Sequence, residues 1–158
     1  MDGAAALSSR KLVCFRLALQ EYALPIESVK ETLTLRPLTR VFLTPTWVLG
    51  IINLRGDIVP VLDLAQLLGM PAVDVGDSSR IIILDHAGHS AGIVADELAE
   101  LRDLDDDELL PTPSTLSSEA GEIISGLATV DDGSALRILD LDSLFTSERI
   151  SSLARTRE

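Results

Sequence analysis

The stretch Gly50–Leu64, GIINLRGDIVPVLDL, decides the fold of this chain. One apolar run leads into a charged centre, Arg55-Gly56-Asp57, and a second apolar run leads out of it. Glycine at such a centre is typical of a hairpin turn, because it adopts positive φ without a steric penalty. We therefore predict strands over 48–54 and 57–64, with Arg55 presented at the tip that joins them.

Further short runs of β-branched and aliphatic residues follow the same pattern. Most are bounded by Gly, Asp, Pro or Ser, which favour turns. Several short strands separated by turn signals indicate an all-β barrel or sandwich. The additional predicted strands are 12–17, 21–26, 80–84, 90–95, 123–130 and 135–141.

The chain contains an internal repeat. Gly50–Leu64 and Gly126–Leu141 both begin with glycine and an apolar strand, turn at a charged tip and end in Leu-Asp-Leu. A shift of 69 residues also places Leu12–Phe15 on Ile81–Leu84. Two matches in the same order favour duplication over chance.

The repeat predicts one domain over 11–150, made of two similar barrel lobes that could exchange strands. The lobes cover about 11–69 and 80–145. Each has about five strands, and closing such a small sheet into a barrel hides its edges. Residues 1–10 and 151–158 are expected to be flexible termini.

Each Leu-Asp-Leu ending is predicted to feed a short helix, with Leu67-Leu68 and Leu144-Phe145 at matching distances. Asp63 and Asp140 occupy equivalent places before these helices. Paired carboxylates can act as catalysts. Aspartate at the start of a helix is a favoured N-cap, however, so capping is the preferred interpretation. The tail after Phe145 is predicted to be a frayed helix.

The composition restricts the class of protein. Of 158 residues, 46% are hydrophobic but only 3% are aromatic, so the core must be aliphatic. No apolar run approaches the ~20 residues that span a bilayer, and the N-terminus lacks the apolar stretch of a signal peptide. A net charge of −12 argues against nucleic acid and anionic membranes as partners. The single cysteine fits a reducing compartment. We expect a soluble cytoplasmic protein without direct membrane insertion.

No complete catalytic or metal-binding set is apparent. His86 and His89 form H-x-x-H in a predicted hairpin loop where Gly88 supplies the turn. Only Asp85 is near enough in sequence to act as another ligand, whereas zinc requires four. Cys14 lies within an apolar strand and is interpreted as a buried, inert thiol, although the sequence leaves a Cys–His pair open. We therefore expect no metal, no cofactor and no catalysis.

The acidic run Asp103-x-Asp105-x-Asp107 resembles the start of an EF-hand loop. It has Glu108 and Ser114 where such a loop requires glycine and a bidentate glutamate. A solvated acidic face within an irregular stretch, 103–122, is the preferred interpretation. No glycine-rich phosphate-binding motif is present.

Across Leu12–Phe145 the chain resembles the CheW family of bacterial chemotaxis coupling proteins. The hallmark is an apolar strand that leads into Asn53-Leu54-Arg55-Gly56, followed by Val59-Pro60-Val61-Leu62-Asp63-Leu64. The supporting stretches are Phe15-x-Leu17, Glu21-Tyr22-Ala23-Leu24-Pro25-Ile26, Val29-x-Glu31 and Gly126. The resemblance implies a mostly β fold of two intertwined, five-stranded, SH3-like barrels with short helices. That expectation agrees with the repeat.

The resemblance also implies a non-catalytic signalling adaptor. Members of the family hold the histidine kinase CheA to the cytoplasmic tips of methyl-accepting chemoreceptors. They also form rings with the homologous regulatory domain of CheA. The expected partners are therefore CheA and chemoreceptor tips, at membrane-bound receptor arrays that this protein would join through those partners.

An arginine at a hairpin tip has no core to fill, and its guanidinium suits bidentate recognition of a carboxylate. The resemblance implies that several residues lie at or near partner-binding surfaces, and that the groove between the barrels takes the receptor tip helix. Leu98 joins them as the counterpart of Val29 in the repeat. The candidate partner-binding residues from motif and repeat are Val29, Glu31, Gly50, Asn53, Arg55, Gly56 and Leu98.

One departure from the family pattern concerns Phe42-Leu43, where the family usually has a small or polar pair. If exposed, these two side chains predict an additional partner contact with its own preference. Two alternatives to the chemotaxis adaptor stay open. One is a CheW-like adaptor of a pilus or surface-sensing chemosensory system. The other is a small-molecule-binding or enzymatic β-barrel module that uses an inter-barrel cavity with His86 or Cys14.

Overall fold

A computed structural model describes residues 9–110, 123–129 and 133–146. The expectations for residues 1–8 and 151–158, for the tail 147–150 and for the polar stretch 111–122 lie outside these residues. Residues 9 and 10, expected to be part of a flexible terminus, belong instead to a strand and pair with Asp105 and Leu104. Among the described residues, no helix combines the length and the apolar character needed to cross a membrane.

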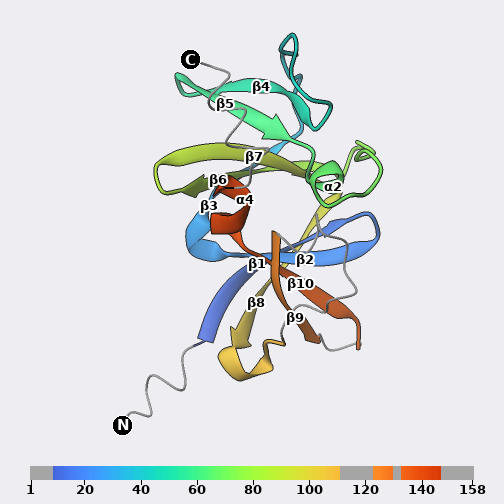
Figure 1. Ribbon diagram of the computed structural model, residues 1–158, viewed down its shortest axis with the longest axis vertical. Helices are drawn as coiled ribbons and strands as arrows, with labels where there is room; N and C mark the ends of the chain where they lie inside the picture. The colour runs from blue at the N-terminus through green and yellow to red at the C-terminus, as the bar shows by residue number, and fades with distance from the viewer. Residues whose placement is uncertain (1–8, 111–122, 130–132, 147–158) are drawn as a thin grey trace.

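The described chain is mostly β-strand, with short helical turns between strands (Figure 1). The elements are β1 (Ser9–Leu17), β2 (Gln20–Pro25), η1 (Ile26–Ser28), β3 (Val29–Thr34), β4 (Val48–Leu54), β5 (Asp57–Leu62), α2 (Leu64–Leu67), β6 (Arg80–His86), β7 (His89–Ala95), β8 (Glu97–Asp105), η2 (Asp106–Glu108), β9 (Ile124–Thr129), β10 (Ala135–Leu139) and α4 (Leu141–Thr146).

All eight strands expected from the sequence are present, and α2 and α4 confirm the two short helices. The strands β3 and β8 were not expected from the sequence. Both are edge strands with few fully buried residues, so polar and charged residues interrupt the apolar signal. The irregular stretch was expected to begin at residue 103, which is wrong because β8 continues to Asp105.

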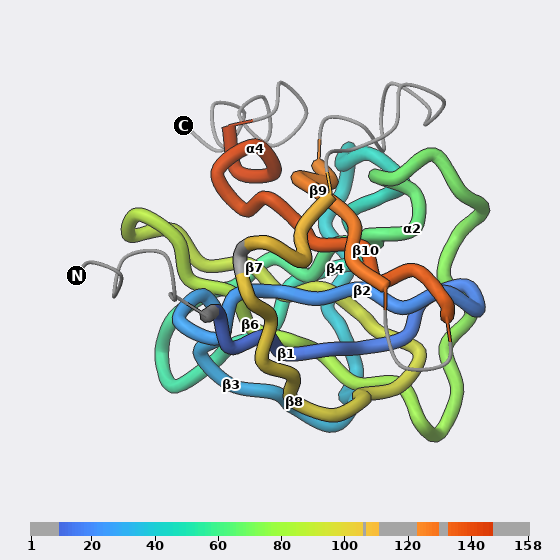
Figure 2. The backbone as a smooth tube through the Cα atoms, turned by 90° about the horizontal axis from the view of Figure 1, so that it is seen from below, coloured from blue at the N-terminus to red at the C-terminus, as the bar shows by residue number. Residues whose placement is uncertain are grey.

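Two five-stranded sheets form the molecule, and each draws strands from both halves of the sequence. The first sheet has the order β8-β1-β2-β10-β9, and the second has the order β3-β6-β7-β5-β4. They lie in the lower and upper parts of Figure 1, and Figure 2 shows the same chain from below. Strands are therefore exchanged between the two halves, a possibility that the repeat left open, and the fold consists of two intertwined SH3-like barrels.

The strand registers of the two sheets correspond to each other. In the first sheet Leu12 pairs with Pro25, and the same shift of 69 residues gives the pair Ile81–Val94 in the second. The exchanged strands follow the same rule, because Phe15–Leu98 in one sheet corresponds to Val29–Leu84 in the other. Such matches are what a duplicated unit with exchanged strands would give.

Each sheet closes where its edge segments approach each other. In the second sheet Thr39, which follows the edge strand β3, exchanges two main-chain hydrogen bonds with Ile51 of the opposite edge strand β4. Leu110 and Leu127 make the corresponding bridge in the first sheet. Main-chain closure of this kind removes exposed strand edges.

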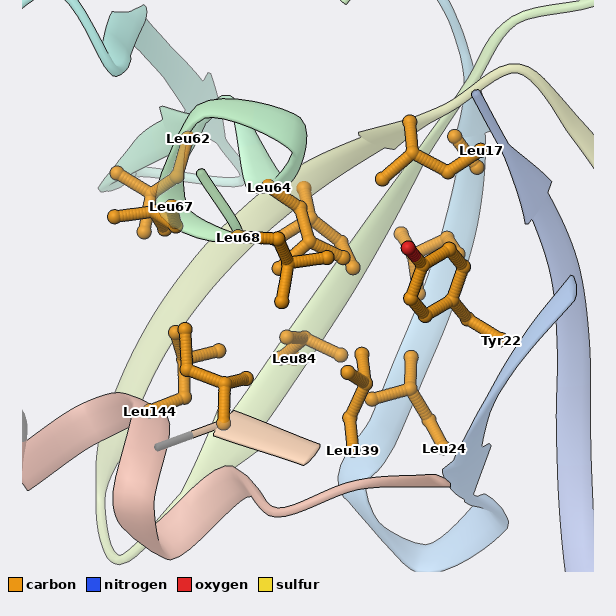
Figure 3. Packing of buried hydrophobic residues seen from close by; sticks show 14 of the residues in the cluster. Leu17, Tyr22, Leu24, Leu62, Leu64, Leu67, Leu68, Leu84, Leu139 and Leu144 are labelled. Atoms are coloured by element: carbon orange, nitrogen blue, oxygen red, sulfur yellow. The ribbon is translucent and has the colours of Figure 1, made fainter. Parts of the chain in front are cut away.

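Three apolar clusters fill the fold. The largest takes Phe15, Tyr22 and Leu24 from the first sheet and Leu84 from the second, and it also buries leucines of α2 and α4 (Figure 3). Two smaller clusters lie within the individual sheets. The clusters are almost entirely aliphatic, as the composition requires. Because the largest cluster joins the two sheets, we expect them to unfold together.

Replacement of Gly50 by alanine is expected to be strongly destabilising. Gly50 has φ +155, and a Cβ there would lie 2.8 Å from the carbonyl oxygen of Thr39, at the closing bridge. Gly56 is the matched control, because it has φ +95 but no atom within 4 Å of an added Cβ. Urea unfolding should show a loss of about 3 kcal/mol or more for Gly50→Ala and of about 1–2 kcal/mol for Gly56→Ala. Equal losses would show that the close approach at Gly50 is not important.

Candidate functional site

The tip of the β4–β5 hairpin is a two-residue turn built to present Arg55. Arg55 and Gly56 have φ values of +53 and +95, as a type I′ turn requires at both central residues. The side-chain oxygen of Asn53 accepts a hydrogen bond from the Gly56 amide at 2.9 Å. Leu54 and Ile52 point into the core on the other face of β4. The hydrogen bond from Gly56 to Asn53 and the core packing of Ile52 and Leu54 therefore hold the turn, and Arg55 projects from a rigid base.

Arg55 forms an ion pair with Glu31 of β3. The Arg55 side chain stays 67% exposed, whereas that of Glu31 is 26% exposed. Because β3 and β4 are the two edge strands of the second sheet, this pair joins its two edges on the outside. Ion pairs this exposed contribute about 0–1 kcal/mol to stability. Because Nη2 of Arg55 makes the bond to Glu31 and the side chain is largely exposed, the other N–H donors of the guanidinium are open to a partner.

Val29 and Leu98 occupy equivalent places at the start of β3 and within β8. Both are half-buried and pack against the largest core cluster. Their equivalence in the repeat is matched by their strand partners, Leu84 and Phe15. Each side chain therefore has a structural role, and only its exposed part could touch a partner.

Gly50 is buried and does not present a contact surface. Its role is to let β4 pass the main chain of Thr39 closely enough to form the closing bridge. The same bridge positions the strand that carries the Arg55 tip. Gly50 therefore affects the position of Arg55 through the backbone of β4 and makes no contact with a partner itself.

Phe42 and Leu43 lie at the tip of the segment between β3 and β4 and are 95% and 96% exposed. Leu43 has φ +64, a left-handed conformation that is uncommon for leucine. Arg36 and Arg40 are exposed on the same segment. Bulky apolar groups held in solvent beside cationic groups are typical of a protein-binding surface.

The structure brings together some of the expected site residues and separates others. Glu31, Asn53, Arg55 and Gly56 form one surface, defined here as the Arg55 surface. Phe42 and Leu43 belong to a neighbouring loop whose first anchor, Thr39, bonds to β4. Leu98 lies on the first sheet, away from both.

Three residues that shape this region were not predicted from the sequence. Thr39 forms the closing bridge, and Thr46 and Gln66 bond to each other through their side chains at 2.8 Å. No local sequence pattern predicts these contacts, because each joins segments that lie far apart in the chain. Leu19, which is fully exposed in the β1–β2 turn, was detectable as an apolar residue between two predicted strands.

Asp63 and Asp140 are N-caps, as expected. The Asp63 carboxylate accepts from the Gln66 amide of α2 at 3.3 Å, and Asp140 accepts from the Ser143 amide of α4 at 3.3 Å. Asp63 is fully buried and also accepts from the Val73 amide at 2.9 Å. These hydrogen bonds occupy the carboxylates in structural roles.

The groups considered for catalysis lie apart. Cys14 is buried in the first sheet, and desolvation by burial raises the pKa of its thiol to about 11. His86 ends β6 in the second sheet, where its Nε2 lies 3.3 Å from Asp142 and its ring stacks on Phe145. Among the described residues, no group of three or more His, Cys, Asp or Glu side chains could hold a metal ion. Asp85 and His89 therefore do not complete a site with His86.

Comparison with known proteins gives consistent results. The model of the CheW-like domain family matches residues 11–149. The chain is 31% identical to the chemotaxis protein CheW of Rhizobium meliloti over 139 residues, which cover 88% of this chain and 89% of that protein. It is 28% identical to the protein FrzA of Myxococcus xanthus, covering 96% of this chain and 95% of FrzA.

A solved structure is also similar. The scaffolding protein TtCheW from Thermoanaerobacter tengcongensis superposes with a TM-score of 0.80 at 33% sequence identity. The match covers 90% of this chain and 96% of TtCheW. The likeness therefore extends over both sheets and is not limited to one of them.

Removal of the exposed ion pair should change stability only slightly. Arg55→Ala is expected to lower the free energy of unfolding by less than about 1 kcal/mol, because water screens the pair. The double charge swap Arg55→Glu with Glu31→Arg should recover most of the loss in either single reversal. Urea unfolding at low and high salt measures this, with Lys11→Ala as a control at another exposed pair. A loss above about 3 kcal/mol for Arg55→Ala would indicate a folding role.

Cys14 should make stability fall at alkaline pH. Burial raises the pKa of its thiol from the ordinary 9.0 to about 11, so the unfolded chain loses this proton first as pH rises. The contribution is present below about pH 9 and is lost between pH 9 and 11. Thermal unfolding across this range should show a steeper fall for the wild type than for Cys14→Ala. Equal slopes in the two proteins would contradict the assignment.

Proposed function

This chain belongs to the CheW-like domain family, and from that premise we propose that it is a non-catalytic signalling adaptor. In this role it couples the cytoplasmic tips of methyl-accepting chemoreceptors to the regulatory domain of the histidine kinase CheA. It acts in the cytoplasm and reaches the membrane-bound array only through these partners. It needs no cofactor, no metal and no nucleic acid.

The observation that carries the proposal is the exposed Arg55 on its rigid turn. The turn is satisfied internally by Asn53 and Gly56, and Glu31 engages the guanidinium from only one side. A guanidinium has five N–H donors, so unused donors face solvent. A prearranged cation of this kind suits a charge-assisted contact with a carboxylate of a partner protein.

The surface around Arg55 supports a protein partner in preference to a small molecule. Glu31 and the exposed part of Val29 lie on β3, and the exposed apolar pair Phe42 and Leu43 lies on the same sheet toward the other end of β4 (Figure 1). Positioned arginines and exposed apolar side chains are both enriched in protein-binding surfaces. Following the family, the groove between the two barrels would take the receptor tip helix.

The small-molecule or enzymatic alternative has less support. One cavity among the described residues has a volume of about 80 Å³, and its polar lining residues are Arg102, Asp103, Glu108 and Thr129. Pockets for drug-sized ligands are typically about 300–1,000 Å³. Cys14 and His86 belong to different sheets and contact different neighbours, so they do not support a shared nucleophilic site.

A second candidate function is favoured by the exposed apolar pair. Phe42 and Leu43 replace a pair that is usually small or polar, and both face solvent. This difference fits an adaptor that serves a pilus or surface-sensing chemosensory system with a different partner. The partner captured most tightly by the purified protein distinguishes the two candidates.

The direct test is binding of purified Arg55 variants to the cognate kinase and receptor. Arg55→Ala should weaken assembly by roughly 1–3 kcal/mol, as expected for the loss of a charge-assisted hydrogen bond. Arg55→Asp should weaken it further through charge repulsion. Co-sedimentation with receptor membranes and kinase measures both variants. Wild-type assembly by Arg55→Asp would reject the Arg55 surface as the contact.

The exposed apolar pair should contribute separately. Phe42→Ser with Leu43→Ser is expected to weaken binding of one partner by more than tenfold, because two apolar contacts are lost. Val75→Ser is the matched control, because Val75 is an exposed apolar residue on a different segment. Isothermal titration with each partner in turn identifies which one is affected. Unchanged affinities for both would remove this pair from the proposed site.

A further inference from the structure

The loop that carries Phe42 and Leu43 is held at two anchors. At the first, Thr39 donates to the Ile51 carbonyl at 3.0 Å and accepts from the Ile51 amide at 2.8 Å. At the second, Thr46 lies against the short helix α2. Between the anchors, the Thr44 hydroxyl donates to the Val41 carbonyl at 2.8 Å and closes a local turn. The direction of the two apolar side chains therefore depends on both anchors.

The second anchor is a clamp made by Gln66. Its side-chain oxygen accepts from the Thr46 hydroxyl at 2.8 Å, and its side-chain nitrogen donates to the Thr46 carbonyl at 3.2 Å. The same nitrogen donates to the Asp63 carboxylate at 2.9 Å. Asp63 is fully buried and accepts from Val73 at 2.9 Å, so Gln66 fastens the loop to a fixed point. Thr46 itself is exposed, and without the clamp it would bond to water.

The other half of the molecule shows that capping alone does not need glutamine. Asp140 stands where Asp63 stands, and Ser143 stands where Gln66 stands. Ser143 donates its amide to Asp140 at 3.3 Å and its hydroxyl at 2.9 Å. These distances match those that Gln66 makes to Asp63. The two contacts from Gln66 to Thr46 therefore go beyond capping.

We propose that Gln66 is a positioning residue that fixes the direction of Phe42 and Leu43, and so sets the affinity of the partner that covers them. Gln66 acts through Thr46 and lies outside the apolar contact itself. The proposal rests on the proposed function in taking Phe42 and Leu43 as a partner contact. Its first readout, however, concerns the free protein and needs no partner.

The informative variant is Gln66→Ser, which copies the cap of the other half and removes the clamp. Backbone order parameters for Phe42, Leu43 and Thr44 should fall toward the values below about 0.6 that mark flexible backbone. Exchange of the Val48 amide, which donates to the Pro45 carbonyl at 3.0 Å, should become about three- to tenfold faster. The turn at Gly88 serves as the internal control and should not change.

Thr46→Val removes the hydrogen bond from the Thr46 hydroxyl to Gln66 and leaves the sequence of α2 unchanged. It therefore tests whether the clamp orders the loop even if Gln66→Ser disturbs the helix. The double variant should be no more mobile than Gln66→Ser alone, because both remove the same contact. Unchanged order parameters in both single variants would overturn the proposal.

Binding to the purified kinase and receptor completes the test. Gln66→Ser should lower the affinity for the partner whose binding is reduced by Phe42→Ser, by about three- to tenfold. A mobile loop with wild-type affinity would also overturn the proposal. Failure of the wild-type chain to bind either partner would instead reject the proposed function, and the order parameters would still decide whether Gln66 positions the loop.

Discussion

Two parallel strand pairings hold the molecule together, between β5 and β7 and between β10 and β2. Each joins the last strand of one half of the chain to the second strand of the other half. Apart from these pairings, main-chain bonds join the hairpins β4–β5 and β9–β10 to the rest of their sheets at the closing bridges of Thr39 and Leu110. The second sheet is built from the single segment 29–95, whereas the first takes strands from both sides of that segment. The largest apolar cluster forms only when both sheets are present.

The candidate site is a consequence of how the second sheet closes. Closure requires β4 to pass Thr39 at a distance that only glycine allows, which accounts for Gly50. It also brings the Arg55 turn beside Glu31 of the opposite edge. The exposed arginine and its acidic neighbour thus lie at one end of the closed edge, and the apolar loop lies toward its other end (Figure 1). Main-chain bonds hold the Arg55 turn, and the loop is held by the bridge at Thr39 and the side-chain contacts of Gln66. A surface held in this way loses less conformational entropy on binding.

Local chemistry made much of this predictable from the sequence. The Arg55 turn, the caps at Asp63 and Asp140 and the buried Cys14 follow from turn preference, capping and apolar context. The edge strands β3 and β8 did not, because polar residues on an edge strand resemble a loop. The exposure of Phe42 and the clamp at Gln66 could not be predicted from the sequence either, since both depend on segments distant in the chain. Assignment of the partner-binding residues came from family resemblance and remains a prediction.

Reconstitution of kinase control tests the central claim most directly. Purified cognate kinase and receptor membranes are mixed with increasing amounts of the protein, and kinase phosphorylation is followed with and without receptor. An adaptor should make kinase activity depend on the receptor and should saturate near stoichiometric amounts, with Arg55→Asp inactive. Two results would contradict this role. One is full receptor control of kinase activity at trace amounts of the protein, as for an enzyme. The other is kinase activity that stays independent of the receptor at excess protein.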